Sequence, residues 1–146
     1  MSEQTHSVTY TIAAEIAALV STVTHGDATL SAVVDFCPDI KLEKVKERQI
    51  VVTPQSYARA NATRGHSEQN VVFNVGFCEK IALSDIDDRV RMVEKVMKAL
   101  ERQVLRISQS LILTVEAEPI YDARWLLANR IFVSVLIVTV KVLADD

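Results

Sequence analysis

Residues that could carry catalysis are few and scattered in this sequence. Its three histidines, His6, His25 and His66, each stand alone, and no Ser-His-acid or Cys-His arrangement can be argued for them. His66 could pair with the nearby Arg64 and Glu68, although exposed histidines in polar segments usually have no catalytic role. With three glycines in all, the chain has no glycine-rich phosphate-binding loop. We therefore do not expect an enzyme.

Cysteine and acidic side chains give equally little support for a metal or cofactor site. Cys37 and Cys78 fit no metal-binding or redox spacing, and we expect two buried free thiols. Glu116 and Glu118 share one face of a predicted strand and could form a metal pair. No histidine is near them, so a solvated face is the better interpretation. The sequence predicts no metal and no cofactor.

The segment with most functional promise is the polar stretch from Pro54 to Gln69, which lies between two predicted strands. Ile50 to Thr53 is β-branched, and from Val71 to Ile81 most odd positions are apolar, as in a strand with one buried face. A hairpin needs only about two to five linking residues, so we expect a long, functional loop here. Its candidate partner-binding residues are Tyr57, Arg59, Arg64 and His66.

Length and composition predict one globular domain spanning residues 1–146. Apolar residues make up 49% and charged residues 24%, which are globular values. No apolar run reaches the roughly 18 residues of a membrane span, and the apolar stretch 12–23 lacks the basic start of a signal peptide. Residues 1–40 hold five acids and no Lys or Arg, whereas residues 41–110 hold thirteen bases and nine acids. This division suits surfaces that meet head to tail, and solvated faces explain it equally well.

Hydrophobic periodicity predicts two helices lying on a sheet. Residues 9–23 form the first helix, and Ser84 opens a longer one whose apolar stripe comprises Ile86, Val90, Val93, Met97, Leu100, Val104 and Ile107. We expect further strands at 32–36, at 111–117 and at about 130–142, with residues 120–129 as a connection. In the strand at 111–117, the predicted inward residues are Leu111, Leu113, Val115 and Ala117. The predicted fold class is α+β: an antiparallel or mixed sheet of about four to five strands, two helices packed on one face, and the long loop between the second and third strands.

The last predicted strand is apolar on both of its faces. One face carries Phe132, Leu136, Val138, Val140 and Val142, and the other carries Ile131, Val133, Val135 and Ile137. Two helices can cover only one side of a small sheet, so the second face needs a neighbouring subunit or another layer. The subunit-interface candidates are Ile131, Val133, Val135 and Ile137.

Several passages of the sequence resemble the tail terminator proteins of tailed bacteriophages. Phe36-Cys37-Pro38 through Leu42, ending in Ile50-Val51-Val52-Thr53-Pro54, resembles that family's proline, acidic–leucine linker and Val-x-Val-x-Pro passage. Thr63-Arg64, followed by Val75-Gly76-Phe77 and Lys80, resembles its loop and next strand. Ile120-Tyr121-Asp122, then Arg130, Phe132-x-Ser134-Val135 and Val138-x-Val140, resembles its closing segment. The resemblance covers most of the chain from about residue 30, through degenerate motifs that carry no chemistry.

The resemblance implies a structural virion protein rather than an enzyme. Family members form a ring, usually of six subunits, at the head-proximal end of the tail tube, where they end tube polymerisation and join the tail to the head. The implied partners are further copies of the chain, the tail tube protein and a head completion or connector protein. DNA would pass through the lumen without sequence-specific binding. The resemblance implies no cofactor and no membrane contact, and a location in the virion neck and, during assembly, in the host cytoplasm.

Three other interpretations stay open. Another neck component, such as a head completion or connector protein, would use similar parts. A small-molecule-binding or enzymatic α+β domain would need a concave pocket lined by convergent polar groups, for which the sequence offers few candidates. A nucleic-acid-binding module would need a basic stripe with aromatic residues, which only Tyr57, Arg59 and Arg64 approach.

Overall fold

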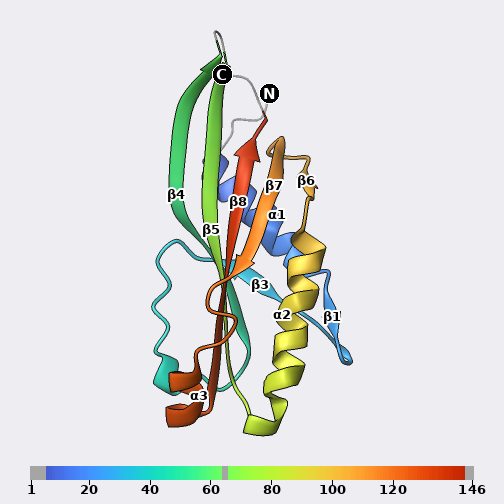
Figure 1. Ribbon diagram of the computed structural model, residues 1–146, viewed down its shortest axis with the longest axis vertical. Coiled ribbons are helices and arrows are strands. Elements are labelled where there is room, and N and C mark those ends of the chain that lie inside the picture. Colours follow the sequence, from blue (N-terminus) through green and yellow to red (C-terminus); the bar gives the residue numbers. More distant parts are fainter. Residues whose placement is uncertain (1–5, 64–65, 144–146) are drawn as a thin grey trace.

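The protein is seen in a computed structural model that describes residues 6–63 and 66–143 (Figure 1). Within these residues the chain forms three α-helices, two short 3-10 helices and eight strands. In chain order the elements are α1 (Val8–Val20), β1 (Thr24–His25), β2 (Ala28–Thr29), β3 (Ala32–Val34), η1 (Leu42–Lys44), β4 (Gln49–Thr63), β5 (His66–Lys80), η2 (Leu83–Asp85), α2 (Ile86–Leu100), β6 (Val104–Leu105), β7 (Ser110–Ala117), α3 (Ala123–Asn129) and β8 (Ile131–Val142).

The main sheet has the strand order β3-β4-β5-β8-β7-β6, and all neighbours run antiparallel except β3 and β4. The β3–β4 ladder is short because of Pro54. The N–H of Asp35 donates to the carbonyl of Val52 at 3.1 Å, and a parallel ladder would next require an N–H at position 54. Proline has none, so the Thr53 hydroxyl donates to the Asp35 carbonyl instead, and β3 pairs only with the beginning of β4.

β4 and β5 form one long hairpin where the sequence predicts a long loop. Pairing runs from Gln49 opposite Cys78 to Thr63 opposite His66, with an irregularity after Pro54 and another near the far end. The loop prediction is wrong because backbone hydrogen bonds hold this polar stretch as a ladder, which needs no apolar side chains. The predicted fold is corrected in two further respects. In the described residues the main sheet has six strands rather than four to five, and a β1–β2 hairpin and α3 are added to the two predicted helices.

α1 and α2 lie on one face of the sheet and build the main core with it (Figure 1). α1 confirms the first predicted helix and begins after Ser7, whose hydroxyl accepts a hydrogen bond from the N–H of Tyr10 at 3.0 Å. The core collects buried side chains from both helices and from the two central strands: Ile12, Ile16 and Val20; Met92, Val93, Val96 and Leu100; Val71, Phe73, Val75 and Phe77; and Phe132, Leu136, Val138 and Val140.

α2 is shorter than its apolar stripe suggests. The helix ends at Leu100, and Arg102, with a φ of 58°, turns the chain into β6. Val104 and Ile107 therefore leave the helix and are 58% and 80% exposed. The apolar residues keep their helical spacing beyond the end of the helix by coincidence. A residue in the left-handed region ends the helix before the apolar stripe ends.

The first half of β7 presents a different face to the core from the one predicted. Its ladder with β8 is irregular at Leu113, between Ile112 and the next paired residue. Ile112 is buried, while Leu113 is exposed and Leu111 is half-buried on the other face. Beyond this β-bulge, Val115 and Ala117 pack against the core as predicted. One extra residue moves every later side chain to the opposite face.

The two faces of β8 are covered unequally. The face with Phe132 and Leu136 lies beneath the helices. The opposite face is covered only at its beginning, where Ile131 joins Val45 and Cys78 in a second, small cluster. Four partly buried side chains close this cluster: Ile40, Leu42, Trp125 and Val133. Trp125 comes from α3, in the stretch predicted as a connection.

Candidate interaction surface

The predicted partner-binding residues lie on the long hairpin rather than on a loop. Tyr57 and Arg59 are exposed residues of β4, opposite Val71 and Gln69 on β5. Val71 points into the core, so Tyr57 and Arg59 lie on the helix side of the sheet, and the Tyr57 hydroxyl is hydrogen-bonded to the Gln69 side-chain carbonyl. Position 64 lies outside the described residues. His66 is the first residue of β5, and its side chain also lies outside what the structure describes.

The face of the sheet away from α1 and α2, here called the bare face, holds a shallow apolar groove. The groove has a volume of about 270 Å³ and lies between the segment that leads into β4 and the strands β4, β5 and β8. Its lining is mainly apolar: Pro38, Ile40, Leu42, Val51, Thr53, Asn74, Gly76, Phe77, Cys78, Val133, Ser134 and Val135. Extensive apolar surface of this kind marks sites where partner proteins bind.

The four interface candidates divide along the bare face. Ile131 is 1% exposed within the small cluster, so the subunit itself already covers it. Val133 is half-buried at the edge of that cluster and also lines the groove. Val135 lines the groove too, and Ile137, opposite Asn74, is half-buried further along the strand. Of the four, Val135 and Ile137 are the least involved in packing within the subunit.

Gly76 forms part of the groove lining and has no evident role within the subunit. It lies in one row between Val51 on β4 and Val135 on β8. A Cβ atom placed on it would meet no atom closer than the Val51 carbonyl oxygen, at 4.0 Å. Glycine inside a strand weakens it, and often marks a point where another molecule approaches closely. Among the described residues, no other segment approaches Gly76 this closely.

A second groove, of about 570 Å³, runs between α2 and β7. Met97, Leu113 and Val115 provide its apolar surface. The remaining lining residues are mostly charged, with both signs present: Glu94, Lys98, Glu101, Arg102, Thr114 and Glu116. It lies along the side of β7 that faces away from β8.

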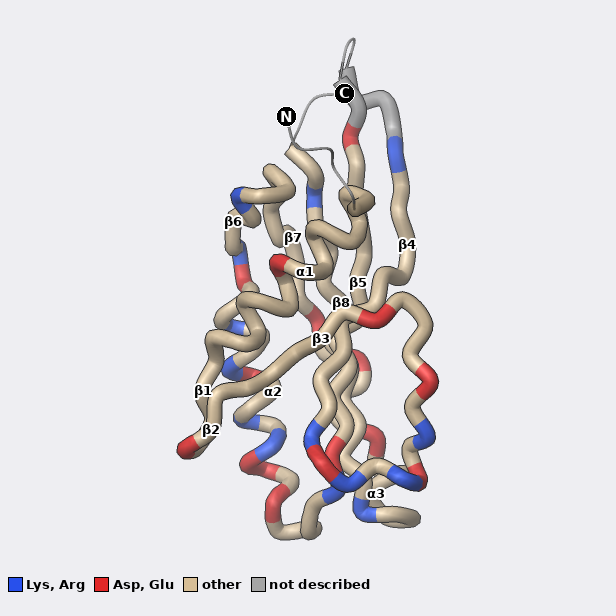
Figure 2. Tube along the Cα trace, turned by 180° about the vertical axis from the view of Figure 1, so that it is seen from behind, with Lys and Arg blue, Asp and Glu red and all other residues tan. Residues whose placement is uncertain are grey.

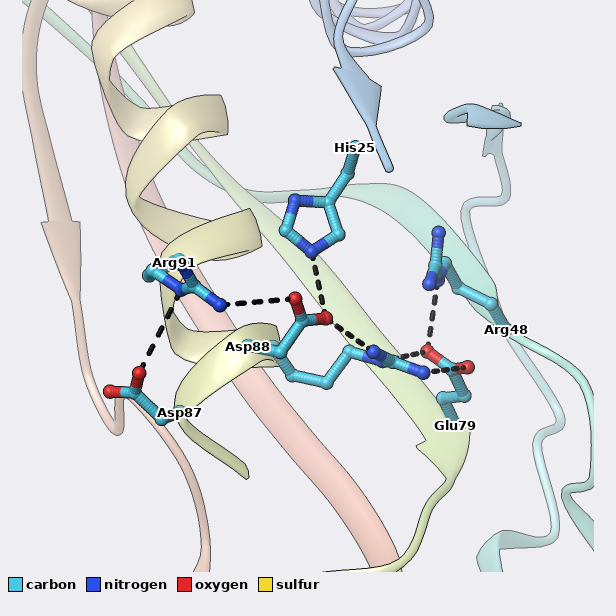
Figure 3. A network of polar contacts seen from close by, with 7 residues as sticks. His25, Arg48, Glu79, Asp87, Asp88 and Arg91 are labelled. Carbon is cyan, nitrogen blue, oxygen red and sulfur yellow. Dashed lines mark hydrogen bonds and ion pairs between the residues drawn. The ribbon is translucent and has the colours of Figure 1, made fainter. Parts of the chain in front are cut away.

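The polar network below the core joins four separate parts of the chain (Figure 3). His25 of β1 lies 2.8 Å from Asp88 at the start of α2, and Arg89 contacts both Asp88, at 2.5 Å, and Glu79 at the end of β5, at 3.0 Å. Glu79 also accepts a hydrogen bond from Arg48, which precedes β4, at 2.9 Å. The network therefore ties the β1–β2 hairpin, α2 and the β4–β5 hairpin together.

Ionisation within this network follows from its hydrogen bonds. The bond from His25 lowers the pKa of Asp88 below its ordinary value, and Arg89 adds to the effect. Glu79 raises the pKa of the Arg89 guanidinium, which stays charged in any case. An ionised Asp88 can only accept, so the Nε2 atom of His25 carries the proton, and Nδ1 has no partner among the described residues. These groups are engaged in holding the subunit together.

The cysteine and glutamate residues that could have formed a chemical site do not come together in the structure. Cys37 is exposed, which corrects its predicted burial, and Cys78 is buried as predicted, which raises the pKa of its thiol. Glu116 and Glu118 are exposed at the end of β7. In the parts of the chain that the structure describes, no three His, Cys, Asp or Glu side chains gather as metal ligands would. None of the described helices is both long enough and apolar enough to cross a membrane.

Charges of both signs alternate along the surface. Figure 2 shows Lys and Arg intermixed with Asp and Glu along α2 and along the segment that precedes β4. In α2, for example, Arg91 lies 3.7 Å from Asp87 and 3.4 Å from Asp88. A nucleic-acid-binding surface would instead concentrate one sign along a stripe.

The polar network and the Gly76 groove are the features that sequence reasoning missed. His25 and Asp88 are 63 positions apart, and no local pattern links them. The groove had one available signal, an isolated glycine within a strand pattern. The sequence matches no protein-family model, and no curated protein matches it significantly.

Proposed function

We propose that this protein is a structural subunit of a bacteriophage neck, a tail-terminator-like protein that assembles into a ring at the head-proximal end of the tail tube. Its partners would be further copies of the same chain, the tail tube protein and a head completion or connector protein. The proposal starts from the resemblance of residues 36–54, 75–80 and 120–140 to that family. It places the protein in the virion, and in the host cytoplasm during assembly.

The observation that carries an assembly role is the apolar groove on the bare face. Val133 and Val135 lie there beside Gly76, and no helix of the described chain covers them. A subunit that worked alone would gain by burying these residues or by replacing them with polar ones. A partner protein that covers the groove explains both the apolar side chains and the glycine.

The hairpin supports the same proposal. β4 and β5 are the longest strands of the described chain, and their paired ends carry mostly polar residues. In a ring, such a hairpin is suited to reach a neighbouring component through its polar residues. The largest polar network is engaged within the subunit, which leaves the sheet as the main surface for partners.

Particle size tests the proposal directly. Analytical ultracentrifugation and negative-stain electron microscopy of the purified protein should show a closed ring of about six subunits. Added to polymerising tail tube protein, the ring should fix tube length, whereas bovine serum albumin at the same concentration should not. A protein that stays monomeric at high concentration in the presence of tubes contradicts the proposal. A ring that binds heads and ignores tubes assigns it to the head side of the neck instead.

A further inference from the structure

The outer edge of β4 is open along most of its length. β3 pairs with β4 only at Ile50, Val51 and Val52, and Pro54 ends that pairing. From Ser56 to Ala58 no strand of the described chain pairs with this edge. An open edge presents a row of free N–H and C=O groups, which can pair with another chain.

The opposite edge of the sheet, at β7, is open as well. β6 pairs with β7 only at Ser110 and Leu111, and the N–H of Ile112 donates to the carbonyl of Gln103 at 2.9 Å. From Thr114 to Ala117 no described strand pairs with the outer side of β7. The groove between α2 and β7 runs beside this stretch. Its position, between an edge strand and a helix, is one in which other proteins accept an added strand.

The directions of the two edge strands allow antiparallel pairing between copies. Antiparallel pairing holds from β4 to β5, β8 and β7, so β4 and β7 run in opposite directions. A second copy placed beside the first in the same orientation would set its β4 antiparallel to β7 of the first. Within one subunit the two edges are three strand spacings apart, about 14 Å, so they cannot pair with each other.

We propose that β4 of one subunit pairs with β7 of the next, so that the sheet continues from copy to copy. This inference rests on the proposed ring and specifies its subunit contact. The contact uses two different edges, and such a heterologous contact repeats from copy to copy and forms a ring when the rotation between copies closes. The added β4 lies beside the α2–β7 groove, which the neighbour then covers.

The positions of the open stretches determine how neighbouring copies are offset. Ala58 shares a row with Asn70, and Glu116 shares a row with Asn74, four residues further along β5. Placing Ala58 of one copy opposite Glu116 of the next brings the open stretches together, with an offset of about 13 Å along the strands. Four strands per copy span about 19 Å, so strands in a flat ring would tilt by about 35° from its axis. Closed sheets adopt tilts of about 35–45°.

Disulfide trapping tests this contact in the full-length protein. In a Cys37→Ser background, which removes the exposed thiol, the double variant Ala58→Cys with Glu116→Cys is oxidised mildly and analysed on a non-reducing gel. Opposed residues of antiparallel strands lie close enough for a disulfide, so we expect a ladder of covalent oligomers. Each single variant, and the pair Ala58→Cys with Leu111→Cys, which corresponds to no offset, should give none.

Amide exchange gives a second, independent measurement. The N–H of Glu118 donates to β8, so by alternation the N–H groups of Val115 and Ala117 point to the open edge. In the wild-type ring these two amides should lose the fast exchange that they show in dissociated subunits. If they exchange equally fast in both states and no ladder forms while the protein is a ring, the edge contact is wrong and the ring proposal stands. Dimers formed by the single variant Ala58→Cys would show β4–β4 pairing, which would also overturn the proposed β4–β7 contact. A wild-type monomer overturns both proposals.

Discussion

The Nε2 atom of His25 lies 2.8 Å from Oδ2 of Asp88, which connects the β1–β2 hairpin to the first turn of α2. This bond lowers the folded-state pKa of Asp88 below its ordinary value of 3.8. The ionised form therefore stabilises the fold fully above about pH 4, and this contribution is lost as the pH falls through the folded-state pKa. We expect Asp88→Asn to lower the urea midpoint at pH 7, with a difference from wild type that shrinks towards pH 3.

The matched control for Asp88 is its neighbour Asp87, whose side chain is 91% exposed and, among the described residues, forms an ion pair only with Arg91, at 3.7 Å. Asp87→Asn should leave the urea midpoint near that of wild type at every pH, because exposed pairs contribute little. Equal effects of the two substitutions would mean that the contact with His25 contributes nothing to stability.

Leu100 and Val104 test where α2 ends. Leu100 is fully buried at the last turn, so Leu100→Ala should lower the free energy of unfolding by about 2–5 kcal/mol in chemical denaturation. Val104→Ala, four residues further along the same stripe, should cost less than about 0.5 kcal/mol because the side chain is largely exposed. Similar costs at both positions would restore the longer helix that the sequence predicts.

Adjacent residues of β8 should respond oppositely to a charge. Leu136→Lys buries a charge under the helices and should unfold the subunit, seen as lost cooperative melting. Val135→Lys lies on the bare face. It should leave the melting temperature nearly unchanged, while assembly of the subunit into a ring is lost. A Val135→Lys protein that still assembles normally would remove the groove from the assembly surface.

Gly76 should show a conflict between stability and binding. Gly76→Ala places a Cβ in open space within the strand, so the free energy of unfolding should rise by about 0.5–1 kcal/mol. The same methyl group partly fills the groove, and Gly76→Val should fill it further and weaken partner binding. Binding to tail tubes, measured by co-sedimentation, is the readout. Unchanged binding by a well-folded Gly76→Val protein would show that no partner approaches here.

The basic residues of the hairpin are predicted to dock the ring. Arg59→Glu combined with Arg64→Glu should leave folding and ring size unchanged, since the Arg59 side chain is exposed and outside the core, and the proposed β4–β7 pairing uses the backbone of β4. The double variant should lower the yield of joined, infectious particles in an assembly assay. A normal yield would exclude these two arginines as the docking element, and loss of the ring would show that their side chains contribute to the contact between subunits.

The sequence predicts those elements whose side-chain pattern is repeated over several turns or pairs. Ile12, Ile16 and Val20 mark α1, and the alternation from Val71 to Phe77 marks β5, because each pattern reports one buried face. The hairpin escaped prediction because Tyr57 and Arg59 lie on a ladder held by the backbone, which leaves no signal in side-chain polarity. The inward face of β7 was predicted correctly only at Val115 and Ala117, because a bulge at Leu113 changes which of the earlier residues point inward.

The candidate site could be predicted only in part for a related reason. Val133 and Val135 were identifiable, since a strand that is apolar on both faces needs cover on both. Which face the helices choose depends on packing between distant segments. The segment before β4 and Trp125 of α3 decide which part of the second face is left bare, and neither is local to β8.

Pro54 gives this subunit an adjustable boundary. Pro54 has no N–H at the position where the β3–β4 ladder would next form a hydrogen bond. This single residue therefore decides how much of the β4 edge pairs with β3 and how much is left open to other chains. A lineage, or a designer, that exchanged this proline for valine would allow β3 to lengthen along β4 and close part of the edge. The balance between a self-contained protein and a building block could then shift through one half-buried position at the margin of the core, opposite Phe73.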